Sequence, residues 1–247
     1  FAGPLSWQAA LALQNFNPGY WVPVLDASLS GDVTTEGQLG DGPIPTMNAT
    51  WNLKGHWGSN PASPEGRLVT SSGSWELSGL SLAIGANRVE GSGTWGELLR
   101  GDLALNLPEP EIVLPGLTGN LEATLMAEGT PERPAGELRA GGQNLAWRDL
   151  LTIETLSLEA DLDDELRLTS QLQAENIGGG GQELETLTLK ANGTQGQHTV
   201  SLRAEHSEAD LELAFEGGAG SEWKTWQGQL SPGVIDVPGQ SQPWRLA

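Results

Sequence analysis

Five consecutive segments within residues 151–215 alternate apolar and polar residues, and turn-forming residues separate each segment from the next. Successive side chains of a β-strand point to opposite faces, so strict alternation predicts strands with one apolar face. In the first segment, Leu156 and Leu158 fall on one face and Ser157 on the other. We therefore predict an antiparallel meander of five strands with one apolar side.

The size of this apolar face limits what the chain can become. Five strands of about 10 residues, with about 3.3 Å per residue and about 4.8 Å between strands, present about 800 Å². Monomeric proteins rarely expose a contiguous apolar patch of more than a few hundred Å². Because the sequence contains no long amphipathic helix, we expect the cover to be further sheet, a lipid, or both.

The chain has 247 residues, enough for one large all-β domain or two small ones. Its 34 glycines and 15 prolines suit many strands joined by tight turns. A Pro-rich break at 108–115 divides a first β segment, 1–107, from a second, 116–247, which contains the meander. We expect the two segments to be continuous as one elongated β domain. The stretch 56–66 is expected to be a long mobile loop because it contains two prolines.

Charge excludes one class of partner. The net charge is −20, whereas a nucleic-acid-binding surface must be basic to contact the phosphate backbone. We therefore predict no nucleic-acid partner. A solvated outer sheet face rich in Asp and Glu accounts for the charge. The absence of cysteine fits both an oxidising compartment and the cytosol, and no apolar run approaches the roughly 20 residues of a membrane-spanning helix.

No motif predicts catalysis. Gly91, Gly93 and Gly96 match the dinucleotide fingerprint as a string, but no helix follows to hold a pyrophosphate, so they are interpreted as turn glycines. The acidic cluster at 161–165 lacks the spacing of a calcium loop and is expected to form a hairpin turn. The three histidines lack metal-ligand spacing. The sequence thus predicts no enzyme, no catalytic residue, no metal site and no cofactor.

Several short phrases, in the same order along nearly the whole chain, carry a family resemblance. They are Leu13–Pro18 with Trp21, Leu29–Gly31, Leu82–Gly91, Leu114–Gly119, Leu145–Leu150, and Trp226–Gly228 leading to Trp244–Leu246. These phrases resemble the C-terminal region of TamB proteins, within the AsmA-like family of bacterial envelope proteins. Because the chain starts at Phe1 without methionine, we expect a piece of a longer protein.

The resemblance implies a long, curled β-sheet, called a β-taco, with a hydrophobic concave groove. It also implies a periplasmic location, an inner-membrane anchor in the full-length protein, and the outer-membrane Omp85-type protein TamA as partner through a region outside this chain. The cargo would be phospholipid or amphipathic β-strand clients. From the alternation, the predicted groove lining is Leu103, Leu105, Leu121, Leu125, Leu156, Leu158, Leu162, Leu166, Leu168, Leu172, Leu187, Leu189, Val200, Leu202, Leu211, Leu213 and Phe215.

Three functions remain open on the sequence. The first is a non-enzymatic conduit that carries phospholipid along the groove between the inner and outer membranes. The second is a chaperone-like scaffold that templates outer-membrane protein or autotransporter strands by β-augmentation together with TamA. The third is a closed β-sandwich or solenoid that serves as a structural or adhesive spacer. In that third case the two halves would cover each other's apolar faces.

Overall fold

The structure is a computed structural model that describes residues 5–20, 26–40, 44–71, 73–220, 224–237, 242 and 244–245. These residues form strands and short 3-10 helices only. The chain divides into two compact units: residues 1–113 with 126–132, and residues 114–125 with 133–247. The division of the chain into segments 1–107 and 116–247 remains a prediction.

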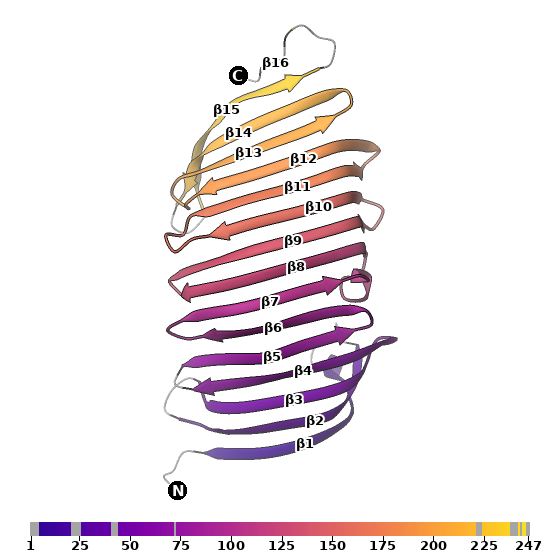
Figure 1. Ribbon diagram of the computed structural model, residues 1–247, viewed down its shortest axis with the longest axis vertical. Coiled ribbons are helices and arrows are strands. Elements are labelled where there is room, and N and C mark those ends of the chain that lie inside the picture. Colours follow the sequence, from indigo (N-terminus) through magenta and orange to yellow (C-terminus); the bar gives the residue numbers. More distant parts are fainter. Residues whose placement is uncertain are drawn as a thin grey trace. The chain divides into compact units, whose positions relative to one another are not determined.

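The first unit is built from consecutive antiparallel strands, each paired with the next in the sequence (Figure 1). Its elements are β1 (Ser6–Phe16), η1 (Pro18–Tyr20), β2 (Ala27–Gln38), β3 (Thr46–Trp57), β4 (Asn60–Ser71), β5 (Ser74–Ile84), β6 (Asn87–Trp95), β7 (Leu99–Leu107) and η2 (Pro110–Ile112). Strand β8 (Leu117–Thr130) contributes residues to both units.

The prediction of a long mobile loop at 56–66 is wrong. Strand β3 continues to Trp57, and β4 starts at Asn60 after a turn in which Gly58 has a φ of +55°. Proline lacks the backbone N–H of a sheet ladder and is usually confined to strand ends, edges and irregularities. Here Pro61 is the second residue of β4, and Pro64 directly precedes a register shift in the β4–β5 pairing. Both prolines are therefore accommodated within the strand.

The buried core of the first unit gathers at one end of its strands. Ala27, Leu29, Leu53, Ala62 and Ile84 are buried together. Ile112 and Val113, from η2 and the residue after it, pack against them. The Pro-rich break is thus an ordered connection that folds onto the ends of the strands.

The second unit is a run of antiparallel strands in sequence order (Figure 1). Its strands are β9 (Arg133–Trp147), β10 (Leu151–Leu162), β11 (Leu168–Gly179), β12 (Gln182–Gly193), β13 (His198–His206), β14 (Ala209–Ala219), β15 (Trp226–Asp236) and β16 (Trp244–Arg245). The five-strand meander is confirmed as β10 to β14. The all-β, antiparallel, taco-like fold class is confirmed as well.

Candidate functional site: an exposed apolar sheet face

An apolar face extends over the second unit because the cross-strand register aligns the apolar positions of successive strands. On β10, Leu158 lies opposite Ala140 of β9 and Leu172 of β11. The row continues through Leu189 of β12 and Leu202 of β13. Directly opposed residues of neighbouring strands share a face and contact each other. Alternation within each strand therefore becomes one continuous apolar surface.

Parallel rows flank this central row on both sides. One holds Gly142, Leu156, Ala174, Leu187, Ala204 and Leu211, and the other holds Leu138, Ala160, Ser170, Ala191, Val200 and Phe215. A fourth row pairs Leu162 with Leu168 and then passes through Gly193 to His198. Leu213 of β14 extends the central row. Every predicted lining residue of the meander except Leu166 thus lies on this face.

Leu166 does not lie on the apolar face, contrary to the predicted lining. It lies in the turn between β10 and β11, with a φ of +61°, and its side chain is exposed. The Asp163 carboxylate closes the turn, since its Oδ1 accepts the backbone N–H groups of Glu165 at 3.0 Å and Arg167 at 2.9 Å. The acidic cluster is confirmed as a hairpin turn. An Asp side chain that bonds the backbone in this way is a common turn device, and it removes Leu166 from the alternation of β11.

The apolar face of the second unit is open to solvent. None of the predicted lining residues is fully buried, and Leu189, in the middle of the central row, is 37% exposed. A face packed under a second sheet would bury its central leucines. Leu189 and Leu168 are therefore not covered by another layer of the second unit itself.

The apolar face also contains residues that alternation misses. Asn144 of β9 and Asn176 of β11 have left-handed backbone conformations, with φ values of +51° and +50°. After Asn144 the side chain of Leu145 returns to the face of Gly142, because a Cβ on Gly142 would lie 2.5 Å from the Leu145 side chain. Two consecutive residues, Gln143 and Asn144, are instead exposed.

The same shift in phase recurs on the neighbouring strands. Leu145 lies opposite Ile153 of β10, which lies opposite Ile177 of β11, which lies opposite Leu184 of β12. These residues extend the apolar face by one row. The sequence signal is a spacing of three between apolar or small residues, as from Ile153 to Leu156. The Asn176 amide donates a hydrogen bond to the Glu154 carboxylate within the polar step between the two rows.

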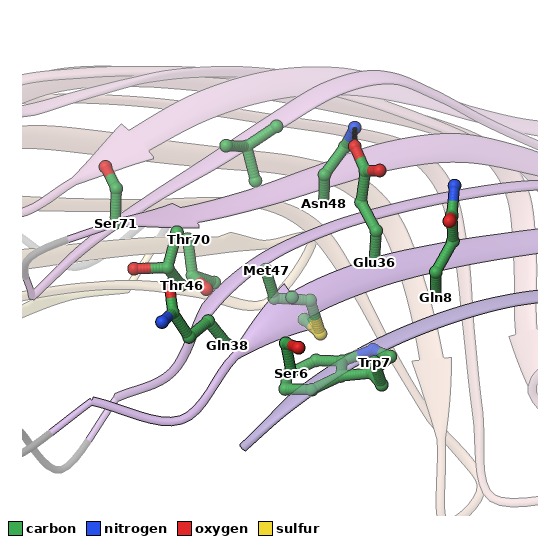
Figure 2. Close-up of a pocket in the computed structure, with 12 residues that line it drawn as sticks. Ser6, Trp7, Gln8, Glu36, Gln38, Thr46, Met47, Asn48, Thr70 and Ser71 are labelled. Atoms are coloured by element: carbon green, nitrogen blue, oxygen red, sulfur yellow. Dashed lines mark hydrogen bonds between the residues drawn. The ribbon is translucent and has the colours of Figure 1, made fainter. Parts of the chain in front are cut away.

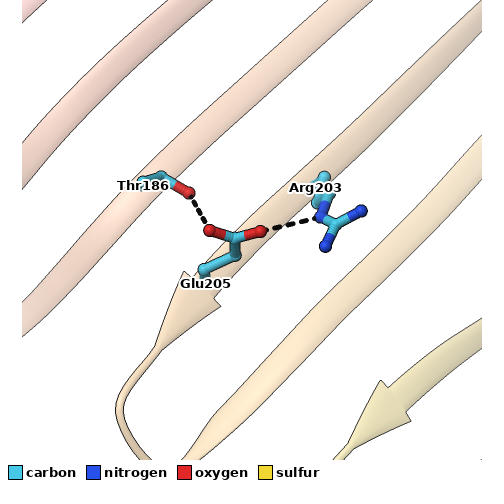
Figure 3. Close-up of polar contacts among 3 residues, drawn as sticks. All are labelled: Thr186, Arg203 and Glu205. Atoms are coloured by element: carbon cyan, nitrogen blue, oxygen red, sulfur yellow. Dashed lines mark hydrogen bonds and ion pairs between the residues drawn. The ribbon is translucent and has the colours of Figure 1, made fainter.

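The opposite face of the second unit is polar. Glu159, Gln171 and Lys190 lie opposite one another on successive strands. Figure 3 shows one of its local networks, in which the Thr186 hydroxyl donates to Glu205 at 2.8 Å and Arg203 Nε donates at 3.0 Å. The Thr186 hydrogen bond, helped by the Arg203 charge and hydrogen bond, holds the pKa of the Glu205 carboxyl below its usual value against partial desolvation.

An aromatic side chain ends the apolar face near β15. The Trp226 ring lies over Gly217 and Gly228, since a Cβ at either glycine would come within 2.6 Å of it. Its indole Nε1 donates to His198 Nε2 at 2.9 Å. Since that histidine nitrogen accepts, Nδ1 carries the proton and donates to the Thr194 carbonyl at 3.1 Å. The pair fixes one end of the face.

The first unit carries an apolar face as well. Leu103 and Leu105 of β7 lie opposite Gly91 and Val89 of β6, so the predicted alternation of β7 is confirmed. The interpretation of the three glycines as turn residues holds only for Gly96, because Gly91 and Gly93 lie inside β6. The predicted residues Leu121 and Leu125 lie on β8, in the part of that strand that belongs to the second unit. Gly119 on the same part of β8 lies against the backbone of β9 at Asn144.

A pocket of about 590 Å³ lies near the ends of β1 to β4 and is lined mainly by polar side chains. In Figure 2, Gln8, Glu36 and Asn48 project together from the strands. The Asn48 amide donates to Glu36 at 3.3 Å. The Trp7 ring lies over Gly37, and its Nε1 donates to the Thr35 hydroxyl at 3.1 Å. The apolar side chains of Trp7, Met47 and Val69 also line this pocket.

Comparisons with known proteins agree on one family. A protein-family model described as "TamB, N-terminal domain" matches residues 1–247. The chain is 21% identical over 239 residues to the "Translocation and assembly module subunit TamB" of Haemophilus influenzae. The aligned region covers 94% of this chain and 18% of that protein. No solved structure matches. The matching region is the N-terminal domain, which corrects the C-terminal region that the sequence phrases indicated.

Proposed function

Because the chain belongs to the TamB family, we propose that it is a non-enzymatic segment of the translocation and assembly module that carries phospholipid along its apolar face. The observation that carries the proposal is the exposed row from Leu158 to Leu202. An acyl chain on this row would remove apolar surface from water, which is worth about 0.8 kcal/mol per CH₂ group. Such contacts are not directional, so they hold a chain while allowing it to slide.

Membership of this family also supports a proposed location. The chain spans 18% of the length of the curated relative, and we propose that it lies in the periplasm as part of a protein anchored in the inner membrane. Among the residues that the structure describes, no helix is long and apolar enough to cross a bilayer. TamA, an outer-membrane protein of the Omp85 type, is the proposed partner through another region. Lipid would then pass between the inner and outer membranes.

Photo-cross-linking tests the conduit. A photoreactive residue at Leu168 faces the apolar side, whereas one at Thr169, the next residue of β11, faces the polar side. In cells that express the full-length protein and incorporate labelled phosphate, phospholipid is expected on the Leu168 variant and not on the Thr169 variant. Equal labelling of both, or labelling of neither, would contradict the conduit.

A second candidate is a scaffold for outer-membrane protein assembly. The name of the Haemophilus influenzae relative, a translocation and assembly module subunit, favours it. An amphipathic client strand has an apolar side that fits the same face. This function predicts cross-links from Leu168 to an unfolded outer-membrane protein in place of phospholipid. The same experiment therefore separates the two functions.

A further inference from the structure

A row of glycines crosses the sheet of the second unit at the end next to Trp226. Gly193 of β12 lies opposite His198 of β13, which lies opposite Gly217 of β14, which lies opposite Gly228 of β15. Because glycine has no side chain, the sheet surface along this row is bare backbone unless a neighbouring residue covers it. We call these three glycines the glycine row.

The Trp226 side chain covers two members of the glycine row. Its six-membered ring lies within 2.6 Å of the place that a Cβ on Gly217 or Gly228 would take. Trp226 is also 47% exposed, so much of its ring faces solvent. The contact with glycine supplies no directional bond, whereas the indole N–H donates to His198 Nε2 at 2.9 Å. This hydrogen bond is therefore the interaction that orients the ring.

The His198 ring is held independently of the tryptophan. Its Nδ1 lies 3.1 Å from the Thr194 carbonyl. Nδ1 carries a proton both in this neutral tautomer and in the imidazolium, so it donates to Thr194 in either state. Nε2, by contrast, is an acceptor in the neutral ring and a donor in the imidazolium. Protonation of His198 thus changes the atom that Trp226 contacts and leaves the other anchor in place.

We propose that His198 and Trp226 form a proton-controlled latch, in which neutral His198 holds the indole over the glycine row and protonated His198 releases it. In the imidazolium state the Nε2–H would point at the indole N–H, so two donors would meet where a hydrogen bond now lies. The two ring centroids are 6.3 Å apart, and His198 lies at the N–H edge of the indole. That edge of an aromatic ring is positive, so it does not attract a cation.

The surroundings of His198 contain few charges. On the described parts of β12 to β15, the next row on the same face is apolar and holds Ala191, Val200, Phe215 and Leu230. The turn 194–197 has no charged residue. Glu216 lies opposite Thr199 and therefore belongs to the polar face, and Lys224 lies before β15 at an exposed position. Histidine is the side chain that ordinarily changes charge between about pH 5 and 8, so we expect the latch to open as the pH falls through this range.

The latch goes beyond the proposed function, because it concerns when one end of the apolar face is covered, whatever that face binds. With the indole in place, the backbone at Gly217 and Gly228 is shielded. With the indole released, the same backbone is open to solvent or to a ligand.

NMR spectroscopy of the full 247-residue chain tests the latch. A ¹⁵N-labelled sample gives indole N–H signals from ten tryptophans, and Trp226→Phe identifies the signal of Trp226. Between about pH 8 and pH 5, this signal is expected to shift from a hydrogen-bonded to a solvent-exposed position, in step with the protonation of His198. The nuclear Overhauser contacts between the Trp226 ring and Gly217 and Gly228 are expected to be lost. A ring that keeps these contacts when His198 is protonated would overturn the proposal.

His198→Gln provides an independent test, because a glutamine amide oxygen can accept the indole N–H and does not titrate in this range. Trp226 is expected to stay over the glycine row at every pH in this variant. The matched control is His206→Gln at the other end of β13, where His206 Nδ1 accepts the Glu208 N–H at 3.0 Å; this variant is expected to keep the wild-type transition. The other nine indole signals show whether each variant is folded. A Trp226 signal that still titrates in His198→Gln, or that no longer titrates in His206→Gln, would contradict the latch.

Discussion

Replacing Leu189 by aspartate is the sharpest test of the apolar face as a lipid-binding surface. Leu189 is the central residue of its row, between Leu172 and Leu202, and is 37% exposed. Because the side chain already meets water, an aspartate can hydrate its charge in the free protein. The substitution is therefore expected to cost only about 1 kcal/mol of folding free energy through lost cross-strand contacts.

Lipid binding should suffer more than stability. Burying a whole leucine side chain is worth about 1.5–3 kcal/mol, so covering the exposed third of Leu189 contributes roughly 0.5–1 kcal/mol. A carboxylate beneath the acyl chain adds a desolvation cost of at least about 1 kcal/mol. The sum, about 2 kcal/mol, corresponds to about a 30-fold higher dissociation constant. Titration with a phospholipid that carries a fluorophore on its acyl chain measures this change.

The matched control is Thr188→Asp, one residue earlier on β12 and on the polar face opposite Arg203. It introduces the same charge in the same strand, and its lipid affinity is expected to stay at the wild-type value. Urea unfolding of both variants checks that they are folded. A folded Leu189→Asp variant with wild-type affinity, or an equal loss in both variants, would refute the assignment of the apolar face.

Three further predictions concern the fold and the polar face. Ile84→Ala is expected to lower the free energy of unfolding by about 2–4 kcal/mol, because Ile84 is buried in the core. Leu103→Ala, on the exposed face, is expected to lower it by less. Urea denaturation of both variants measures the difference. Asn176→Val is expected to lower the free energy of unfolding by about 1–2 kcal/mol, because a β-branched residue must then adopt the φ of +50°. A free energy of unfolding equal to that of Asn176→Gly would contradict this reasoning. Thr186→Val is expected to raise the pKa of the Glu205 carboxyl toward its usual value, which an NMR titration measures. Because the pKa of Glu205 is lower in the folded state, its contribution to stability is present above the unfolded pKa and is lost as the pH falls through the folded pKa. An unchanged titration of Glu205 in the variant would argue against the hydrogen bond from Thr186.

Much of the fold could be predicted from the sequence because strand periodicity is local. Alternation over Leu156 to Leu162 already determines which side chains share a face, and the turn at Asp163 sets where one strand ends. The resulting meander matches the structure strand by strand. The same logic predicted which residues of β10 to β14 share the apolar face, apart from Leu166, whose position depends on a hydrogen-bonded turn. That these residues line a lipid groove stays a prediction.

The remaining features depend on contacts between residues far apart in the sequence or on backbone conformations that alternation does not reveal. A residue with a left-handed backbone conformation, such as Asn144 or Asn176, shifts the alternation by one position. Leu145 therefore joins the apolar face, although strict alternation along β9 would place it on the opposite face. Likewise, a Pro-rich stretch looks like a break in the sequence, whereas Asn87, more than twenty residues earlier, fastens it through Glu109 over the strand ends. The sequence by itself determined that each strand has one apolar side. Only the tertiary structure decided which part of that side is covered and which is left open, because burial depends on partners that the fold brings together.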